Sequence, residues 1–166
     1  MTRPRPTLAL LLSLAALGLS ACGFRPLYAE PGVTGGLSAI EVAAPDGRTG
    51  YLIGEALGES LAGGGGPAAW RLDLDLGEQR FPRGLRVDNV ATRYEYVLVA
   101  AYTLRSVATG APAKTGRVRV ELTYDSADQP FASVSAQQDA QERAAAEAAR
   151  RIQLELAAWF AEQPRP

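Results

Sequence analysis

Three runs of alternating apolar and polar residues constrain the fold of this chain more than any other feature of its sequence. They are "WRLDLDLGEQ" (residues 70–79), "TRYEYVLVAAYTLRS" (92–106) and "RVRVELTY" (117–124). Successive side chains of a strand point to opposite faces of a sheet, so each run predicts a strand with one buried and one solvated face. The turn-rich "ATGAPAKTG" (108–116) joins the last two runs and predicts a hairpin. Strands of this kind accept helices on one face only.

Two further segments repeat apolar residues at intervals of three and four, which predicts helices. The first is "GYLIGEALGESLA" (50–62), for which Thr49 is the expected N-cap. The second is "SAQQDAQERAAAEAARRIQLELAAWF" (135–160), where Ser135 and Gln138 have the spacing of a capping box. Its apolar stripe is expected to pack on the sheet. The members of that stripe are Ala145, Ala148, Ala149, Ile152, Leu156, Trp159 and Phe160.

With a short strand expected at 37–45, the predicted order is strand, helix, three strands, helix. The expected fold class is α+β, a two-layer sandwich with two helices on one face of a four-stranded mixed sheet. The expected organisation is a cleaved signal peptide (1–21), a lipidated N-terminus and extended tether (22–36), one sandwich domain (37–161) and a disordered tail (162–166).

The start of the chain has the pattern of a bacterial lipoprotein signal. Arg3 and Arg5 precede the apolar run "TLALLLSLAALGLSA", which at 15 residues is shorter than the about 20 that a membrane-spanning helix needs. The run ends in "LSAC", which resembles a lipobox and indicates acylation at Cys22, the single cysteine. Several acyl chains on one residue anchor a protein stably. Gly23, where a retained lipoprotein would have aspartate, favours the outer membrane.

Composition excludes several classes of function. The chain has no histidine, and its one cysteine is assigned to lipid, so zinc, copper or iron sites built from nitrogen or sulfur ligands are not expected. Catalytic dyads that need histidine or a free cysteine are excluded likewise, and no cofactor is expected. Loss of Arg3 and Arg5 leaves 15 basic against 18 acidic residues, which argues against nucleic-acid binding.

Six arginines form the candidate binding set. Four occur within 14 residues, in "RFPRGLRVDNVATR", and the other two lie on the last predicted strand, "RVRVELTY". They are Arg80, Arg83, Arg86, Arg93, Arg117 and Arg119. A guanidinium group binds phosphate through two parallel hydrogen bonds, so an anion-recognition patch is one interpretation. A solvated loop is the other.

Two more constellations have structural as well as functional interpretations. Tyr94, Tyr96 and Tyr102 share one face of a predicted strand, where they would either stack against a ligand or pack in the core. Asp73 and Asp75 also share a face, as paired catalytic carboxylates do, but an alternating strand leaves them solvated. Core packing and a solvated strand face are the favoured interpretations, and no enzyme activity is expected.

Three segments together resemble the lipopolysaccharide-assembly lipoprotein family LptE, in its alphaproteobacterial form. They are "CGFRPLY" after the lipobox, "ATRYEYVLVAAYTL" on a predicted strand, and the C-terminal stretch from "LTYDSADQPF" to "LELAAWF". The resemblance implies two helices on a four-stranded sheet. It also implies a non-enzymatic role as plug and assembly factor inside the outer-membrane barrel LptD, with the domain on the periplasmic side and in contact with lipopolysaccharide.

Two other functions stay open at this point. One is a stand-alone periplasmic lipoprotein that binds lipid or glycan as a chaperone. The other is a lipoprotein hydrolase using serine and carboxylates, which the missing histidine and the missing Gly-x-Ser-x-Gly motif disfavour. Co-purification with a barrel protein would separate the first of these from a translocon subunit.

Overall fold

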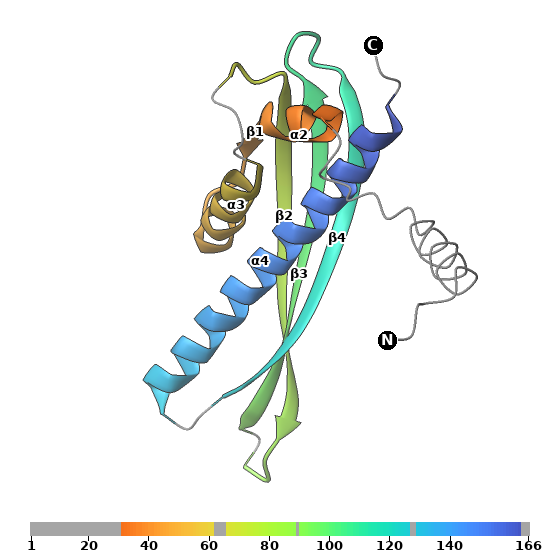
Figure 1. The fold of residues 1–166 in the computed structure, drawn as a ribbon. Helices are drawn as coiled ribbons and strands as arrows, with labels where there is room; N and C mark the ends of the chain where they lie inside the picture. Colours follow the sequence, from red (N-terminus) through yellow and green to blue (C-terminus); the bar gives the residue numbers. More distant parts are fainter. Residues whose placement is uncertain (1–30, 62–65, 89, 127–128, 164–166) are drawn as a thin grey trace, which may run out of the picture.

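The computed structural model describes residues 31–61, 66–88, 90–126 and 129–163, which form one mixed sheet with helices against it (Figure 1). The strands are β1 (Ile40–Ala43), β2 (Trp70–Leu85), β3 (Ala91–Ser106) and β4 (Pro112–Asp125). The helices are α2 (Pro31–Ser38), α3 (Arg48–Leu61) and α4 (Pro130–Glu162). The predicted α+β class and the order β-α-β-β-β-α are confirmed, with α2 as an additional helix before β1. The predicted signal peptide, Cys22, the tether up to residue 30 and residues 164–166 lie outside the described residues.

The strands lie in the order β1-β2-β3-β4, with β1 parallel to β2 and the other neighbours antiparallel. The predicted β3–β4 hairpin is confirmed. β2 and β3 pair from Trp70 with Ser106 to Leu85 with Ala91, so they form a long ribbon that extends beyond the helices (Figure 1). The sequence predicts an end of β2 near Gln79, but the strand continues to Leu85. Pro82 lies where β2 is an edge strand, because β1 pairs with β2 only at residues 70–73, and prolines are tolerated at such edges and at irregularities like the register shift after Pro82.

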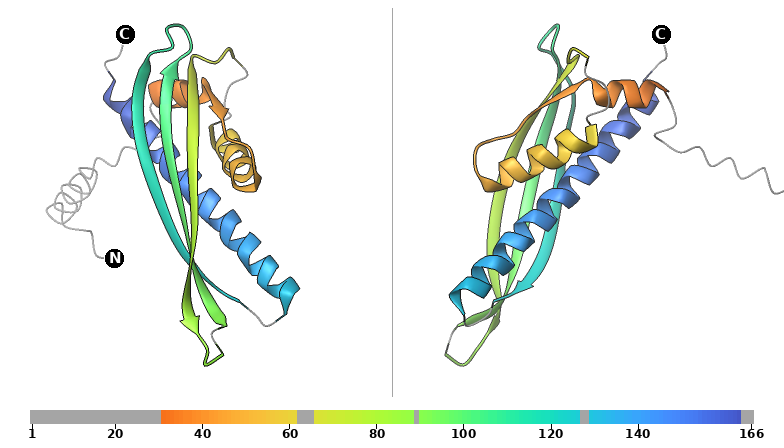
Figure 2. Two further views of the ribbon diagram at one scale, coloured as in Figure 1. Left: turned by 180° about the vertical axis from the view of Figure 1, so that it is seen from behind. Right: turned by 60° about the vertical axis from the view of Figure 1, so that its left-hand side comes forward.

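The described helices α2, α3 and α4 all lie on one face of the sheet (Figure 2). We call the opposite face, which none of these helices covers, the bare face. Leu72 and Leu98 on the strands are fully buried against Ile53 of α3 and Ile152 of α4. Five of the seven predicted stripe residues of α4 are buried, and Trp159 and Phe160 pack against the core while partly exposed. The many alanines keep α4 slim enough to approach both α3 and the sheet. Within the described ranges no helix is both long and apolar enough to cross a membrane.

The predicted extended tether is wrong for residues 31–36, because α2 begins at Pro31. Proline fits the first position of a helix, where its missing N–H has no partner to lose. Val33 and Leu37 of α2 are buried in the core, and Gly36 lies against the ring of Phe160, since a Cβ at position 36 would come 2.5 Å from Cδ1 of that ring. Packing against a residue far away in the sequence thus overrides the low helix propensity of three glycines.

Both predicted helix starts need correction. Thr49 is the second residue of α3 and is buried, and its hydroxyl oxygen has no hydrogen-bond partner within the described part of the chain. α4 begins at Pro130, so Ser135 lies within the helix and makes no capping box. Its N-cap residue, Gln129, makes no side-chain cap bond. Proline at the first position replaces the expected cap in setting this helix end.

Candidate functional site

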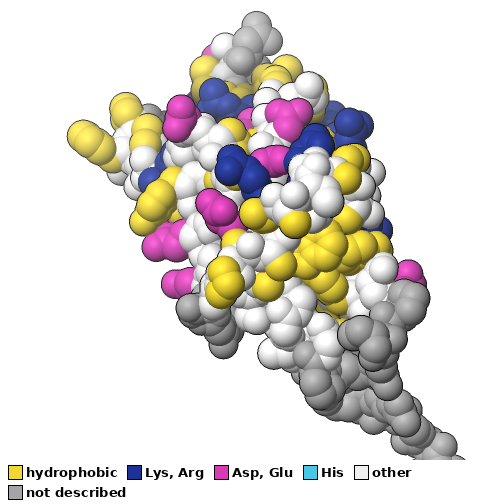
Figure 3. Space-filling model, turned by 90° about the horizontal axis from the view of Figure 1, so that it is seen from above, with side chains coloured by type: hydrophobic (Ala, Val, Ile, Leu, Met, Phe, Trp, Pro, Cys, Tyr) yellow, Lys and Arg dark blue, Asp and Glu magenta, His cyan; other side chains and the backbone are white. Residues whose placement is uncertain are grey.

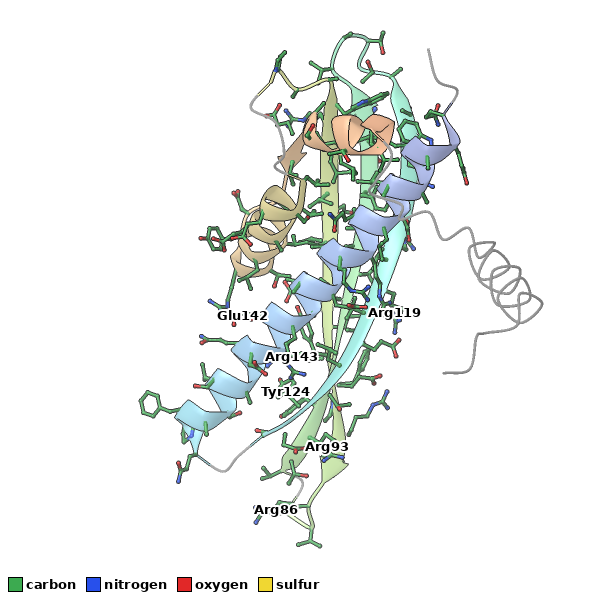
Figure 4. All side chains as sticks on the ribbon, in the orientation of Figure 1. Arg86, Arg93, Arg119, Tyr124, Glu142 and Arg143 are labelled. Carbon is green, nitrogen blue, oxygen red and sulfur yellow. The ribbon has the colours of Figure 1, made fainter. Side chains whose placement is uncertain are left out.

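The six candidate arginines fall into two groups along the sheet. Arg80, Arg83, Arg86 and Arg93 lie at the end of the β2–β3 ribbon, whereas Arg117 and Arg119 on β4 pair with Ala101 and Val99 of β3. Val99 lies six positions after Arg93 on β3, which is about 20 Å of extended strand. Figure 4 shows the same order, with Arg86 at the ribbon end, Arg93 next and Arg119 nearer the middle of the sheet. The structure therefore does not bring the six into one cluster.

The first group also divides between the two faces of the ribbon. Arg80 lies on the helix side, where it donates to Oε1 of Gln137 on α4. Arg83 lies on the bare face, where its Nε donates to Oε2 of Glu95 at 2.7 Å and its guanidinium carbon lies 5.8 Å from the centre of the Phe81 ring. Both faces of the ribbon end therefore carry an arginine that a ligand could contact.

Carboxylates offset most of the positive charge that the sequence indicates. Four of the six candidate arginines pair with a described carboxylate, as Arg83–Glu95, Arg86–Asp88, Arg93–Asp125 and Arg119–Glu121. The hydrogen bond from Arg93 holds the pKa of Asp125 below its usual range. The arginine side chains of these pairs are about half exposed, and surface ion pairs stabilise a protein little, so a phosphate with a better geometry can compete for the guanidinium.

Aliphatic side chains extend into solvent among these arginines. Leu85 is 63% exposed, Val87 is fully exposed, and Val90 is about half exposed. We call residues 80–88 and 90–93 the distal tip. Phe131, 91% exposed, stands at the start of α4, in the same half of the molecule (Figure 1). Cationic and apolar groups side by side suit an amphiphile that carries both phosphates and acyl chains.

Sequence reasoning identified the arginines of the distal tip but missed its apolar side chains. The signal was present in "GLRVDNV", where leucine and two valines alternate with charged and amide residues just outside the predicted strand. Isolated surface aliphatics are ordinary, so these residues gain meaning only when the structure places them together at one end.

The tyrosine row lies inside the core. Tyr96 and Tyr102 are buried, and their hydroxyls donate to Glu78 at 2.6 Å and to Glu155 at 2.5 Å. Burial, followed by the bond to the carboxylate, raises the pKa of both phenols. Tyr94 stacks on Tyr124 with ring centres 5.6 Å apart. Core packing is therefore the role of this row.

The paired aspartates lie on the bare face of the sheet. Asp73 accepts hydrogen bonds from Arg71 at 2.9 Å and from Arg105 at 3.1 Å, so it belongs to an ion-pair cluster. Asp73 and Asp75 border an open hollow of about 340 Å³ beside Arg117. No group of three or more His, Cys, Asp or Glu within the described ranges is placed to hold a metal ion. The arrangement offers charge pairing and no general acid–base geometry.

A four-stranded mixed sheet with its described helices on one face defines an α+β sandwich, and solved structures agree on this fold. A predicted lipoprotein from Caulobacter crescentus CB15 is 53% identical, with a TM-score of 0.68 over 81% of this chain and 99% of its own. Rare lipoprotein B from Shewanella oneidensis is 16% identical, with a TM-score of 0.57 over 74% and 96%. Lipoprotein B from Nitrosomonas europaea is 15% identical, with a TM-score of 0.57 over 74% and 84%. The last two show the fold alone.

The sequence matches the family described as "LptE: Lipopolysaccharide-assembly" over residues 37–156. This match covers more than half of the chain, so the protein belongs to the LptE family of lipopolysaccharide-assembly lipoproteins. No protein with a curated description is significantly similar to it. The description of the family is that of assembly proteins.

Proposed function

We propose that the protein is the lipid-anchored subunit of the outer-membrane lipopolysaccharide translocon. In this role the domain lies on the periplasmic side and inside the LptD barrel, acts as plug and assembly factor of the barrel, and assists the insertion of lipopolysaccharide into the outer leaflet. Cys22 carries the acyl chains that hold it to the membrane. The proposal takes its pathway from family membership.

The distal tip is the observation that carries the lipopolysaccharide contact. Lipid A combines phosphates with acyl chains, and the tip combines Arg83, Arg86 and Arg93 with the exposed side chains of Leu85 and Val87. The pairs Arg86–Asp88 and Arg93–Asp125 join exposed side chains, so they are weak enough to exchange for a phosphate. Arg80 contributes from the helix side, whereas Arg117 and Arg119 lie too far along the sheet to bind the same phosphate.

A detergent pull-down from envelope membranes tests the proposed role in the translocon. The full chain, carrying a C-terminal tag, is expected to retain a barrel protein of several hundred residues at a stoichiometric level. A stand-alone lipid- or glycan-binding chaperone would bring down lipid without a barrel. Recovery of lipopolysaccharide with no barrel protein would therefore overturn the translocon assignment and leave the chaperone in its place.

A further inference from the structure

The end of the molecule opposite the distal tip gathers aromatic side chains from distant parts of the chain. Trp70 is the first residue of β2, and Trp159 and Phe160 lie near the end of α4. The Trp70 ring meets Trp159 edge to face with centres 5.5 Å apart, and Trp159 meets Phe160 at 4.8 Å. Val107, in the turn between β3 and β4, donates its backbone N–H to the carbonyl oxygen of Ala69. We call Trp70, Val107, Trp159 and Phe160 the proximal cluster.

The proximal cluster is a surface feature as well as a part of the core. Its three rings are partly exposed, and Val107 is 52% exposed. Figure 3 looks onto this end and shows hydrophobic side chains in several patches, the largest of which lies next to Lys, Arg, Asp and Glu side chains. By contrast, Ile152 and Leu156 of the same helix are fully buried. α4 therefore changes from aliphatic core to exposed aromatic surface in its last two turns.

The chain enters the domain at this same end. α2 begins at Pro31 beside the end of α4, and its Gly36 lies against the ring of Phe160 (Figure 1). Cys22 precedes Pro31 by nine residues, which span at most about 30 Å when fully extended. If Cys22 is anchored in a membrane, the membrane surface lies within about 30 Å of the start of α2. The distal tip lies at the other end of the ribbon.

We propose that the proximal cluster lies in the headgroup region of the bilayer to which Cys22 is anchored, with the edges of Trp70 and Trp159 in contact with lipid. The inference rests on acylation of Cys22, which belongs to the proposed function. Tryptophan favours this region because its ring is large and apolar while its indole N–H needs a polar partner. The short connection keeps the cluster close to the bilayer, so each weak aromatic contact acts at a high effective concentration.

Intrinsic fluorescence tests this inference directly, because Trp70 and Trp159 are the two tryptophans of the chain. The acylated mature protein is reconstituted into vesicles of phosphatidylethanolamine and phosphatidylglycerol that contain lipids brominated at defined depths. We expect a loss of emission that is larger for bromines near the headgroups than for bromines at the chain ends. Emission that brominated lipids leave unchanged, from protein that floats with the vesicles, would overturn the inference.

A relocated reporter provides the matched control. In the triple variant Trp70→Phe, Trp159→Phe, Val87→Trp, the one tryptophan lies at the distal tip. Brominated lipid is expected not to quench its emission. Quenching of this variant without quenching of the native pair would show that the tip meets the bilayer, and would overturn the proposed orientation. Flotation with the vesicles separates the two proposals. Protein that does not float would refute the lipid anchor at Cys22 and, with it, the inference. Protein that floats without quenching would refute the inference alone.

Discussion

The ring of Tyr102 on β3 lies directly over Gly116, its cross-strand partner on β4. A Cβ at position 116 would come 2.5 Å from Cε1 of the phenol and closer still to its oxygen. That oxygen donates to Glu155 of α4, so the ring connects the sheet to the long helix. The glycine is what lets the phenol lie flat across β4 and reach the helix.

Replacing Gly116 with alanine should therefore destabilise the domain by about 1–3 kcal/mol, because the buried ring of Tyr102 has no free space to move into. Urea unfolding followed by circular dichroism measures the change. Gly58→Ala in α3 is the matched control. No atom lies within 4 Å of a Cβ there, so this variant should gain about 0.5–1 kcal/mol from helix propensity. Equal midpoints for Gly116→Ala and the parent would contradict the prediction.

Stability should decrease in alkaline solution because of Tyr96 and Tyr102. Burial raises the pKa of both phenols above the value of about 10 that holds in the unfolded chain. The unfolded chain then loses phenolic protons first, so above a pH of about 10 the free energy of unfolding decreases, by up to about 1.4 kcal/mol per pH unit for each tyrosine. Below that pH both phenols are protonated in the folded and in the unfolded chain, so they do not change the free energy of unfolding. Urea titrations across the range should show a shallower alkaline slope for Tyr102→Phe, and an unchanged slope would refute the assignment.

A charge at Ile152 should disrupt the core between α4 and the sheet. Ile152 is fully buried, so Ile152→Asp places a carboxylate in the apolar core, at a cost of about 3–5 kcal/mol. Ala146→Asp on the exposed side of the same helix is the control and should unfold almost as the parent does. Thermal melting of the three proteins measures the difference. Parallel melting curves for Ile152→Asp and Ala146→Asp would show that the stripe is not core.

The distal tip should bind lipopolysaccharide through its arginines. Replacing Arg83 and Arg86 by serine should weaken lipopolysaccharide binding by the mature chain and flatten its dependence on salt, since ions screen such contacts. Melting temperature should change little because both arginine side chains are about half exposed, and ion pairs of such groups contribute little to folding. Arg143→Ser with Arg150→Ser removes the same charge from paired arginines of α4 and should leave binding intact. Intact binding with lost barrel association in the tip variant would mean that these arginines face the barrel wall.

Acylation should depend on Cys22 alone. The variant Cys22→Ala is expected to escape labelling with radioactive fatty acid and to keep its signal peptide, because the lipoprotein peptidase requires a lipidated cysteine. Electrophoresis of labelled cells shows both effects at once. Fatty-acid label on Cys22→Ala would place the anchor elsewhere in the chain.

The sequence specified the sheet well because strand periodicity is a local property. Leu72, Leu74 and their neighbours alternate over enough residues to fix which face is buried. α2 was not predictable in this way: its glycines oppose a helix, and the contact that stabilises it, between Gly36 and Phe160, joins residues far apart in the sequence. Such a contact leaves no local trace.

The candidate site was predictable only in part, for a related reason. A count along the chain finds few acids near the arginines, but strand pairing brings Asp125 to Arg93 across 32 residues and Glu95 to Arg83 across 12. The number of acidic residues near an arginine in the sequence therefore differs from the number near it in the folded sheet. Arg80, Arg83, Arg86 and Arg93 lie at the ribbon end as their closeness in the sequence suggests, whereas Arg117 and Arg119 lie elsewhere on the sheet. A binding role for any of the six stays a prediction.

The sixteen residues of β3 run from the distal tip toward the proximal cluster. At about 3.3 Å per residue, such a strand is roughly 50 Å long. A bilayer with its headgroups is about 40–45 Å thick. The domain is thus about as long as a membrane is thick. If it stands perpendicular to the membrane from an anchor in one leaflet, its arginine-bearing end reaches the level of the headgroups of the other leaflet.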